Sequence, residues 1–149
     1  MSTFIVNYTE VSVFCIIVFA IMLAHDLFGV DRQEKQIKYD RALIIIADSI
    51  RNVVESSGAS GFIGRYGGDE FIVIVHPGGE GDVVELVKDI REYIRSKCMS
   101  EKAPYVLSVG VGYDEFLGDR DSFQQCIRRA DEKLYLNKKQ IKSGKKNGK

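Results

Sequence analysis

Residues 62–75, FIGRYGGDEFIVIV, carry the strongest signal for the fold. Two runs rich in β-forming residues flank Gly67 and Gly68 in this stretch. Glycine accepts the positive φ of a tight turn, so two such runs around a glycine pair predict a β-hairpin. Side chains alternate along a strand, which predicts that Asp69 and Glu70 point to opposite faces. The glycines would let a ligand approach the backbone at the hairpin tip.

Helical and extended segments alternate on both sides of the hairpin. The predicted order is strand, helix, strand, strand, helix, strand, helix, over residues 11–24, 31–55, 62–66, 71–75, a helix that begins at 82, 105–113 and 122–140. This order is the split βαβ, or ferredoxin-like, βαββαβ pattern with an added helix. It predicts an α/β (α+β) fold with a largely antiparallel central sheet and helices packed on it. We expect a single domain over residues 1–142 and a frayed, lysine-rich tail over 143–149.

The apolar run at residues 11–24 has three possible interpretations: a membrane anchor, a signal peptide or a buried strand. A spanning helix needs about 20 apolar residues, more than this run provides. A signal peptide begins with a positive region, and no Lys or Arg precedes Arg32. A strand buried on both faces is a continuous run of Val, Ile and Phe. We therefore expect a strand here and no membrane partner.

Composition limits the possible partners and the cellular compartment. The chain has 149 residues, of which 45% are hydrophobic and 28% charged, as in an ordinary globular domain. Its formal net charge is zero, which gives no electrostatic reason to expect nucleic-acid binding. The three cysteines lie far apart and form no CxxC pair, so neither a disulfide framework nor a zinc site is indicated. A reducing cytoplasm is the expected location.

Three motifs together carry a family resemblance. They are RYGGDEF at residues 65–71, SVGVG at 108–112, and the helix residues Ala130, Asp131, Leu134, Tyr135 and Lys138. With these motifs the chain resembles the GGDEF family, the diguanylate cyclases that condense two GTP into cyclic di-GMP in bacterial signal transduction. The resemblance covers about residues 11–142 and implies the fold of GGDEF and nucleotidyl cyclase palm domains.

The resemblance also implies roles for individual residues. Asp69 would hold a metal ion, and Asp69 and Glu70 would be catalytic if the domain is active. Six residues would contact a nucleotide: Gly67, Gly68, His25, Glu34, Lys138 and Lys142. The alternative for the two lysines is a solvated helix face.

The first predicted strand departs from the family pattern. When the family's N-D-x-[FY]-G is aligned on residues 25–29, Ile17 falls at the position of a metal-ligating aspartate. His25 replaces the guanine-binding asparagine, and Glu34 takes the place of an aspartate that also reads guanine. Glu34 has an alternative role as a first-turn helix carboxylate that the helix dipole favours. With Ile17 in place of a ligand, Mg²⁺ binding is possible but weakened.

Three functions remain open. The leading one is a degenerate GGDEF domain that acts as a regulatory, nucleotide-binding or protein-interaction module in cyclic di-GMP-type signalling, without cyclase turnover. The second is an active diguanylate cyclase that uses Mg²⁺ and another carboxylate, such as Asp26 or Glu34. The third is a structural domain whose pocket is filled by apolar side chains. The expected partners are GTP or another purine nucleotide, a protein partner or a second GGDEF domain, and the chain could form a homodimer.

Overall fold

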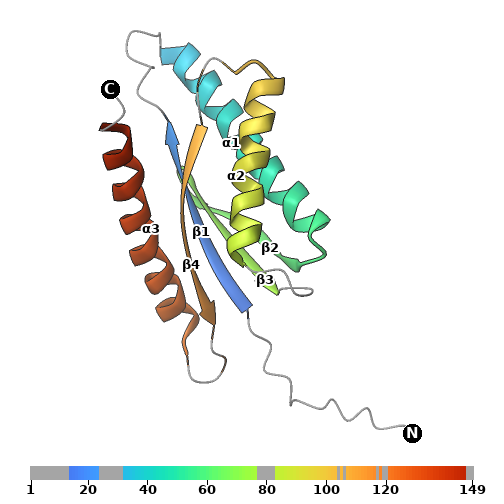
Figure 1. The fold of residues 1–149 in the computed structure, drawn as a ribbon, viewed down its shortest axis with the longest axis vertical. Helices are drawn as coiled ribbons and strands as arrows, with labels where there is room; N and C mark the ends of the chain where they lie inside the picture. Colours follow the sequence, from blue (N-terminus) through green and yellow to red (C-terminus); the bar gives the residue numbers. More distant parts are fainter. Residues whose placement is uncertain are drawn as a thin grey trace, which may run out of the picture.

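The structure is a computed structural model that describes residues 14–23, 32–76, 83–103, 105, 107–116, 118 and 121–146. Its elements, in chain order, are β1 (Phe14–Leu23), α1 (Arg32–Ser56), β2 (Ser60–Gly67), β3 (Glu70–His76), α2 (Val83–Ser100), β4 (Leu107–Phe116) and α3 (Phe123–Lys146). This is the predicted order of strands and helices (Figure 1).

The four strands form one sheet in the order β2-β3-β1-β4. Every pair of neighbours is antiparallel. β1 and β3 therefore lie side by side at the centre of the sheet, which confirms the ferredoxin-like βαββαβ arrangement. The register places Glu70, Ala20 and Gly110 in one row across three strands.

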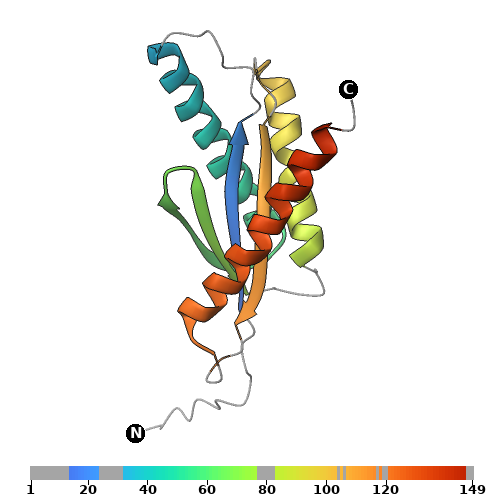
Figure 2. The same ribbon diagram turned by 90° about the vertical axis from the view of Figure 1, so that its left-hand side faces the viewer.

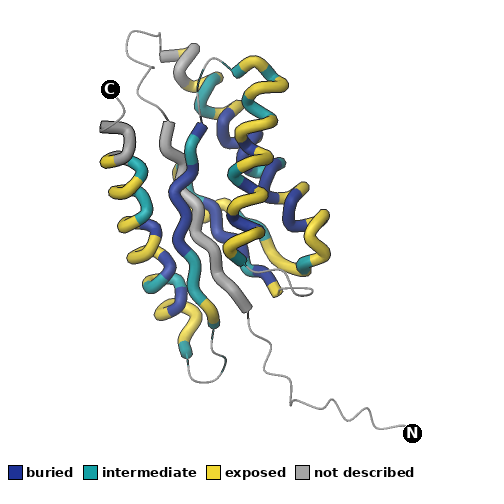
Figure 3. Tube along the Cα trace, in the orientation of Figure 1, coloured by how far each residue is buried: buried dark blue, intermediate teal, exposed yellow. Residues whose placement is uncertain are grey.

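Helices cover both faces of the sheet. α1 and α2 pack against each other on one face, and α3 runs obliquely across β4 and β1 on the other (Figures 1 and 2). β3 is buried from both sides, because Val73 belongs to the core under α1 and α2 while Ile72 packs against α3. Figure 3 shows the buried residues along β4 and on the sides of the helices that face the sheet.

Contact between α3 and β4 depends on a glycine. A Cβ atom built on Gly112 would lie 2.0 Å from the carbonyl oxygen of Ala130 and 2.3 Å from the amide nitrogen of Leu134. Both are backbone atoms of α3, which rotation of a side chain cannot move away. Gly112 therefore allows the helix to approach the strand closely, a role that glycine fulfils because it has no Cβ.

Several predicted boundaries differ from the observed ones. β4 covers Leu107–Phe116 instead of residues 105–113. α3 continues to Lys146 instead of ending at residue 140, so part of the predicted frayed tail is helical. The alternation of apolar and polar residues marks the middle of an element well and its ends poorly, because the last turn of a helix makes few tertiary contacts.

The apolar run of residues 11–24 contains β1, as predicted, and the residues of this run on either side of β1 lie outside the described part. None of the helices in the described part is both long and apolar enough to cross a membrane.

Candidate functional site

The tip of the β2–β3 hairpin is a short turn that the Arg65 side chain stabilises through hydrogen bonds. β2 ends at Gly67, β3 begins at Glu70, and Gly68 adopts a positive φ of 38°. A register shift between Arg65 and Gly67 twists the strand before the turn. The Arg65 side chain donates two hydrogen bonds to the carbonyl oxygen of Gly68, at 3.0 Å from Nε and 2.7 Å from a terminal nitrogen. These bonds hold the turn in one conformation.

The space around the two glycines is open. A Cβ atom built on Gly67 or on Gly68 would meet nothing within 4 Å. The side chain of the preceding Tyr66 is 68% exposed. The turn conformation explains glycine at position 68, where φ is positive, but no contact within the described part of the chain requires glycine at position 67.

The two predicted catalytic carboxylates lie at this open tip. Asp69 and Glu70 are both half-buried. Asp69 belongs to the turn and precedes β3, so the alternation of side chains along a strand does not set its direction. Strand alternation therefore gives no ground for placing Asp69 and Glu70 on opposite faces of the sheet. Glu70 is the first residue of β3 and pairs with Ala20 of β1.

The neighbouring strand offers these carboxylates no acidic partner. The sequence of β1 is FCIIVFAIML, which contains no Asp or Glu at any register position. Ile17 pairs with Val73, three residues along β3 from Glu70. Within the described part of the chain, no three potential metal-ligating side chains gather in one place. Asp69 and Glu70 remain as the donors at the tip, a set that fits Mg²⁺ only when a nucleotide supplies phosphate oxygens as well.

The structure describes the other predicted site residues only in part. Lys138 is half-buried on α3, and no hydrogen bond or ion pair joins it to the hairpin in the described part of the chain. Glu34 lies in α1 and Lys142 in α3, but their side chains are outside the description. His25 and Asp26 are outside the described residues altogether.

Asn137 has a role that the motif comparison does not reveal. Its Oδ1 accepts hydrogen bonds from the amide nitrogen of Val111 and from Arg91, both at 3.0 Å. One side chain of α3 therefore joins β4 to α2. Asn137 is not among the motif residues that carry the family resemblance, and no signal in the sequence pointed to these contacts.

A charged cluster fastens the beginning of α3 to the end of β4. The carboxylate of Asp114 accepts hydrogen bonds from Arg129 and from Lys133, and Arg129 also pairs with Asp121. Burial alone would raise the pKa of Asp114, but the two basic hydrogen-bond donors outweigh burial and hold it below its usual range. The ionised form of Asp114 therefore stabilises the folded protein.

Comparison with known proteins agrees with the fold and with the hairpin. The family model described as "Diguanylate cyclase, GGDEF domain" matches residues 38–144. The chain belongs to the GGDEF domain family. β1 and Ile17 lie before the matched residues.

A curated relative points to the same family. Diguanylate cyclase DosC of Escherichia coli K12 is 31% identical over 83 residues. The match covers 54% of this chain and 18% of the relative, so this chain corresponds to a small part of that protein.

Solved structures share the fold at low sequence identity. Diguanylate cyclase SiaD of Pseudomonas aeruginosa, in complex with its activator SiaC, superposes with a TM-score of 0.65 at 20% identity, covering 87% of this chain and 47% of SiaD. The coiled coil and GGDEF domain of DgcB from Caulobacter crescentus, in complex with c-di-GMP, gives a TM-score of 0.64 at 23% identity, covering 86% of this chain and 65% of that one.

Proposed function

We propose that this chain is a GGDEF domain that has lost cyclase turnover and serves cyclic di-GMP signalling as a regulatory, nucleotide-binding or protein-interaction module in the cytoplasm. The observation that carries the proposal is the sequence of β1. It pairs with β3 directly beside Glu70, yet none of its ten residues is acidic.

The chemistry of the family explains why this strand matters. Phosphodiester formation from a nucleoside triphosphate uses metal ions that bridge the attacking hydroxyl and the leaving phosphate, each held by hard oxygen ligands. Carboxylates on one hairpin, without a partner from the adjacent strand, hold such ions weakly. Removal of a group that stabilises developing charge commonly costs about 3–4 kcal/mol of transition-state stabilisation, a rate loss of more than a hundredfold.

Weak nucleotide binding remains compatible with the hairpin. The tip is open around Gly67 and Gly68, and Arg65 fixes the backbone there before any ligand arrives. Asp69 and Glu70 can share a Mg²⁺ ion that a triphosphate brings. We propose GTP or another purine nucleotide as the ligand, with Lys138, Lys142, His25 and Glu34 as its further contacts.

An active diguanylate cyclase is the second candidate. Both carboxylates of the hairpin are present at an open tip, as turnover would require. A carboxylate from outside the described residues, such as Asp26, would then have to complete the metal site.

A protein partner would give a domain without turnover a function. SiaD, which shares this fold, was solved in complex with an activator protein. We propose an equivalent association for this chain, with another protein or with a second GGDEF domain as a homodimer.

One experiment separates the candidates. The purified chain is incubated with GTP and Mg²⁺ or Mn²⁺, products are followed by mass spectrometry, and the binding of GTP and of cyclic di-GMP is measured by calorimetry. We expect no cyclic di-GMP, and weak GTP binding that Asp69→Asn reduces. Asp131→Asn, which changes an exposed carboxylate on α3, is the matched control.

Two results would contradict the proposal. Cyclic di-GMP that forms with the wild-type chain and disappears in Asp69→Asn would establish the active cyclase. If neither GTP nor cyclic di-GMP binds at about millimolar concentration, nucleotide binding is excluded and a protein-interaction module remains.

A further inference from the structure

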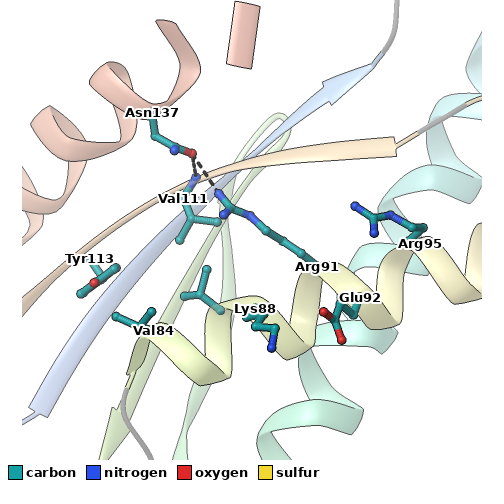
Figure 4. A pocket seen from close by; sticks show the side chains of 9 residues that line it. Val84, Lys88, Arg91, Glu92, Arg95, Val111, Tyr113 and Asn137 are labelled. Carbon is teal, nitrogen blue, oxygen red and sulfur yellow. Dashed lines mark hydrogen bonds between the residues drawn. The ribbon is translucent and has the colours of Figure 1, made fainter. Parts of the chain in front are cut away.

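A cavity lies between α2, β4 and α3, with a volume of about 410 Å³. Figure 4 shows the side chains that line it. None of the hairpin residues lines the cavity, and neither does Lys138. The cavity falls in the size range of small-molecule sites, which start at about 300 Å³.

The charges around the cavity are unbalanced. Lys88, Arg91 and Arg95 line it from α2, where their spacing of three and four residues puts them on one side of the helix. Glu92 is the one carboxylate among the lining residues. No ion pair engages any of the three cations within the described part of the chain, although the whole chain has a net charge of zero. Like charges at this spacing repel one another, so the bare pocket carries an electrostatic cost.

Arg91 carries a further cost, which comes from its burial. It is half-buried, and burial lowers its pKa. One terminal nitrogen donates to Asn137 Oδ1 at 3.0 Å and to the carbonyl oxygen of Val109 at 3.5 Å. Both acceptors are neutral, so these bonds orient the guanidinium without compensating its charge. The other donors of the Arg91 guanidinium have no partner within the described residues.

Asn137 presents a further donor to the cavity. Its Oδ1 already accepts from Val111 as well as from Arg91, which fixes the orientation of the side-chain amide. The amide nitrogen is left to donate. In Figure 4, Arg91 extends from α2 to Asn137, and Arg95 projects toward β4. The polar groups on this wall are therefore almost all donors or cations.

We propose that this cavity binds the phosphate group of a small phosphate monoester, with Arg91 and Arg95 as the main contacts. Guanidinium groups match phosphate oxygens with paired hydrogen bonds, and a dianion compensates the two excess positive charges. Tyr113, Val84 and Val111 supply an apolar wall for the carbon skeleton of the ester. The site is separate from the hairpin and does not depend on the function proposed for it.

The test uses the full chain and four probes in calorimetry: inorganic phosphate, adenosine 5′-monophosphate, adenosine and succinate. We expect the two phosphates to bind with a Kd of about 1 mM or below, and adenosine and succinate to bind at least about tenfold more weakly. Amide NMR shifts on binding of inorganic phosphate should centre on Val111 and on the Asn137 side chain.

Two variants examine the contacts without disturbing the fold. Arg95→Ala and Lys88→Ala remove side chains that make no described hydrogen bond or ion pair, so the free energy of unfolding should stay unchanged. Arg95→Ala should weaken phosphate binding about tenfold and Lys88→Ala less. Arg128→Ala is the matched control, because Arg128 is an exposed arginine on α3 that does not line the cavity.

Any one of four outcomes would overturn the proposal. Neither phosphate probe binds at about 10 mM, or Arg95→Ala binds phosphate as the wild type does. Succinate binds as tightly as phosphate, which would indicate a general anion site. The shifts on phosphate binding fall on Gly67 and Gly68 alone, which would assign the phosphate to the hairpin.

Discussion

Gly112 and Gly67 occupy two regions of the same sheet, and the structure explains them in opposite ways. At Gly112, a Cβ would lie 2.0 Å from a backbone oxygen of α3. At Gly67, a Cβ would meet nothing within 4 Å, and the residue does not have a positive φ. Packing inside the domain therefore explains the first glycine, and no contact in the described part of the chain explains the second.

This difference separates the motifs by function. β4, which contains SVGVG, packs closely against α3 at Gly112. These two elements form the β4–α3 side of the domain. The hairpin motif contributes little to packing at its tip. The proposed nucleotide site gives a reason for a glycine that packing does not require, because a ligand can approach closely a backbone that carries no Cβ. Three variants test this difference between Gly112 and Gly67.

Gly112→Ala should have the largest effect. Because the obstructing atoms belong to the helix backbone, α3 would have to shift, and we expect a loss of about 3 kcal/mol in the free energy of unfolding. Denaturant unfolding followed by circular dichroism measures the loss. A change below about 0.5 kcal/mol would show that α3 docks more loosely than the contact at Gly112 indicates.

Asp114→Asn should have an intermediate effect that depends on pH. The folded-state pKa of Asp114 is lowered, so its carboxylate stabilises the fold above the unfolded pKa of about 3.9, and this stabilisation is lost as pH falls through the folded pKa. We expect Asp114→Asn to cost about 1–2 kcal/mol at pH 7 and less in acid. Unfolding curves at pH 7 and below pH 4 measure the difference.

The matched control for Asp114 is Glu132→Gln. Glu132 pairs with Arg128 at 3.9 Å, but both side chains are largely exposed, so the expected change is below about 0.5 kcal/mol at either pH. Equal losses in Asp114→Asn at both pH values would mean that shape, and not charge, holds α3 to β4 at this point.

Gly67→Ala should have the smallest effect on stability. With open space around the position, we expect the free energy of unfolding to change by less than about 0.5 kcal/mol. Binding of GTP, measured by calorimetry, should nevertheless weaken, because a methyl group would stand where the ligand approaches. If stability and binding both stay unchanged, the open tip is not a ligand site.

The sequence predicted the architecture well because the hairpin signal is local. The glycines between two β-rich runs specify a turn whatever the rest of the chain does, and the order of elements around it admits few topologies. The direction of Asp69 was not predictable, because it depends on the turn and not on strand alternation. The contacts of Arg91 with Asn137 were not predictable either, since the residues are far apart in the chain and meet only after α2 and α3 have packed beside β4.

The position of β4 at the edge of the sheet gives the Arg91–Asn137 pair a further consequence. An edge strand presents unpaired backbone groups that can recruit a strand from another molecule and begin aggregation. Here the carbonyl oxygen of Val109 and the amide of Val111 are already bonded to side chains of α2 and α3. Along this part of β4, the two helices block strand addition, so self-association by sheet extension would have to occur elsewhere on the molecule.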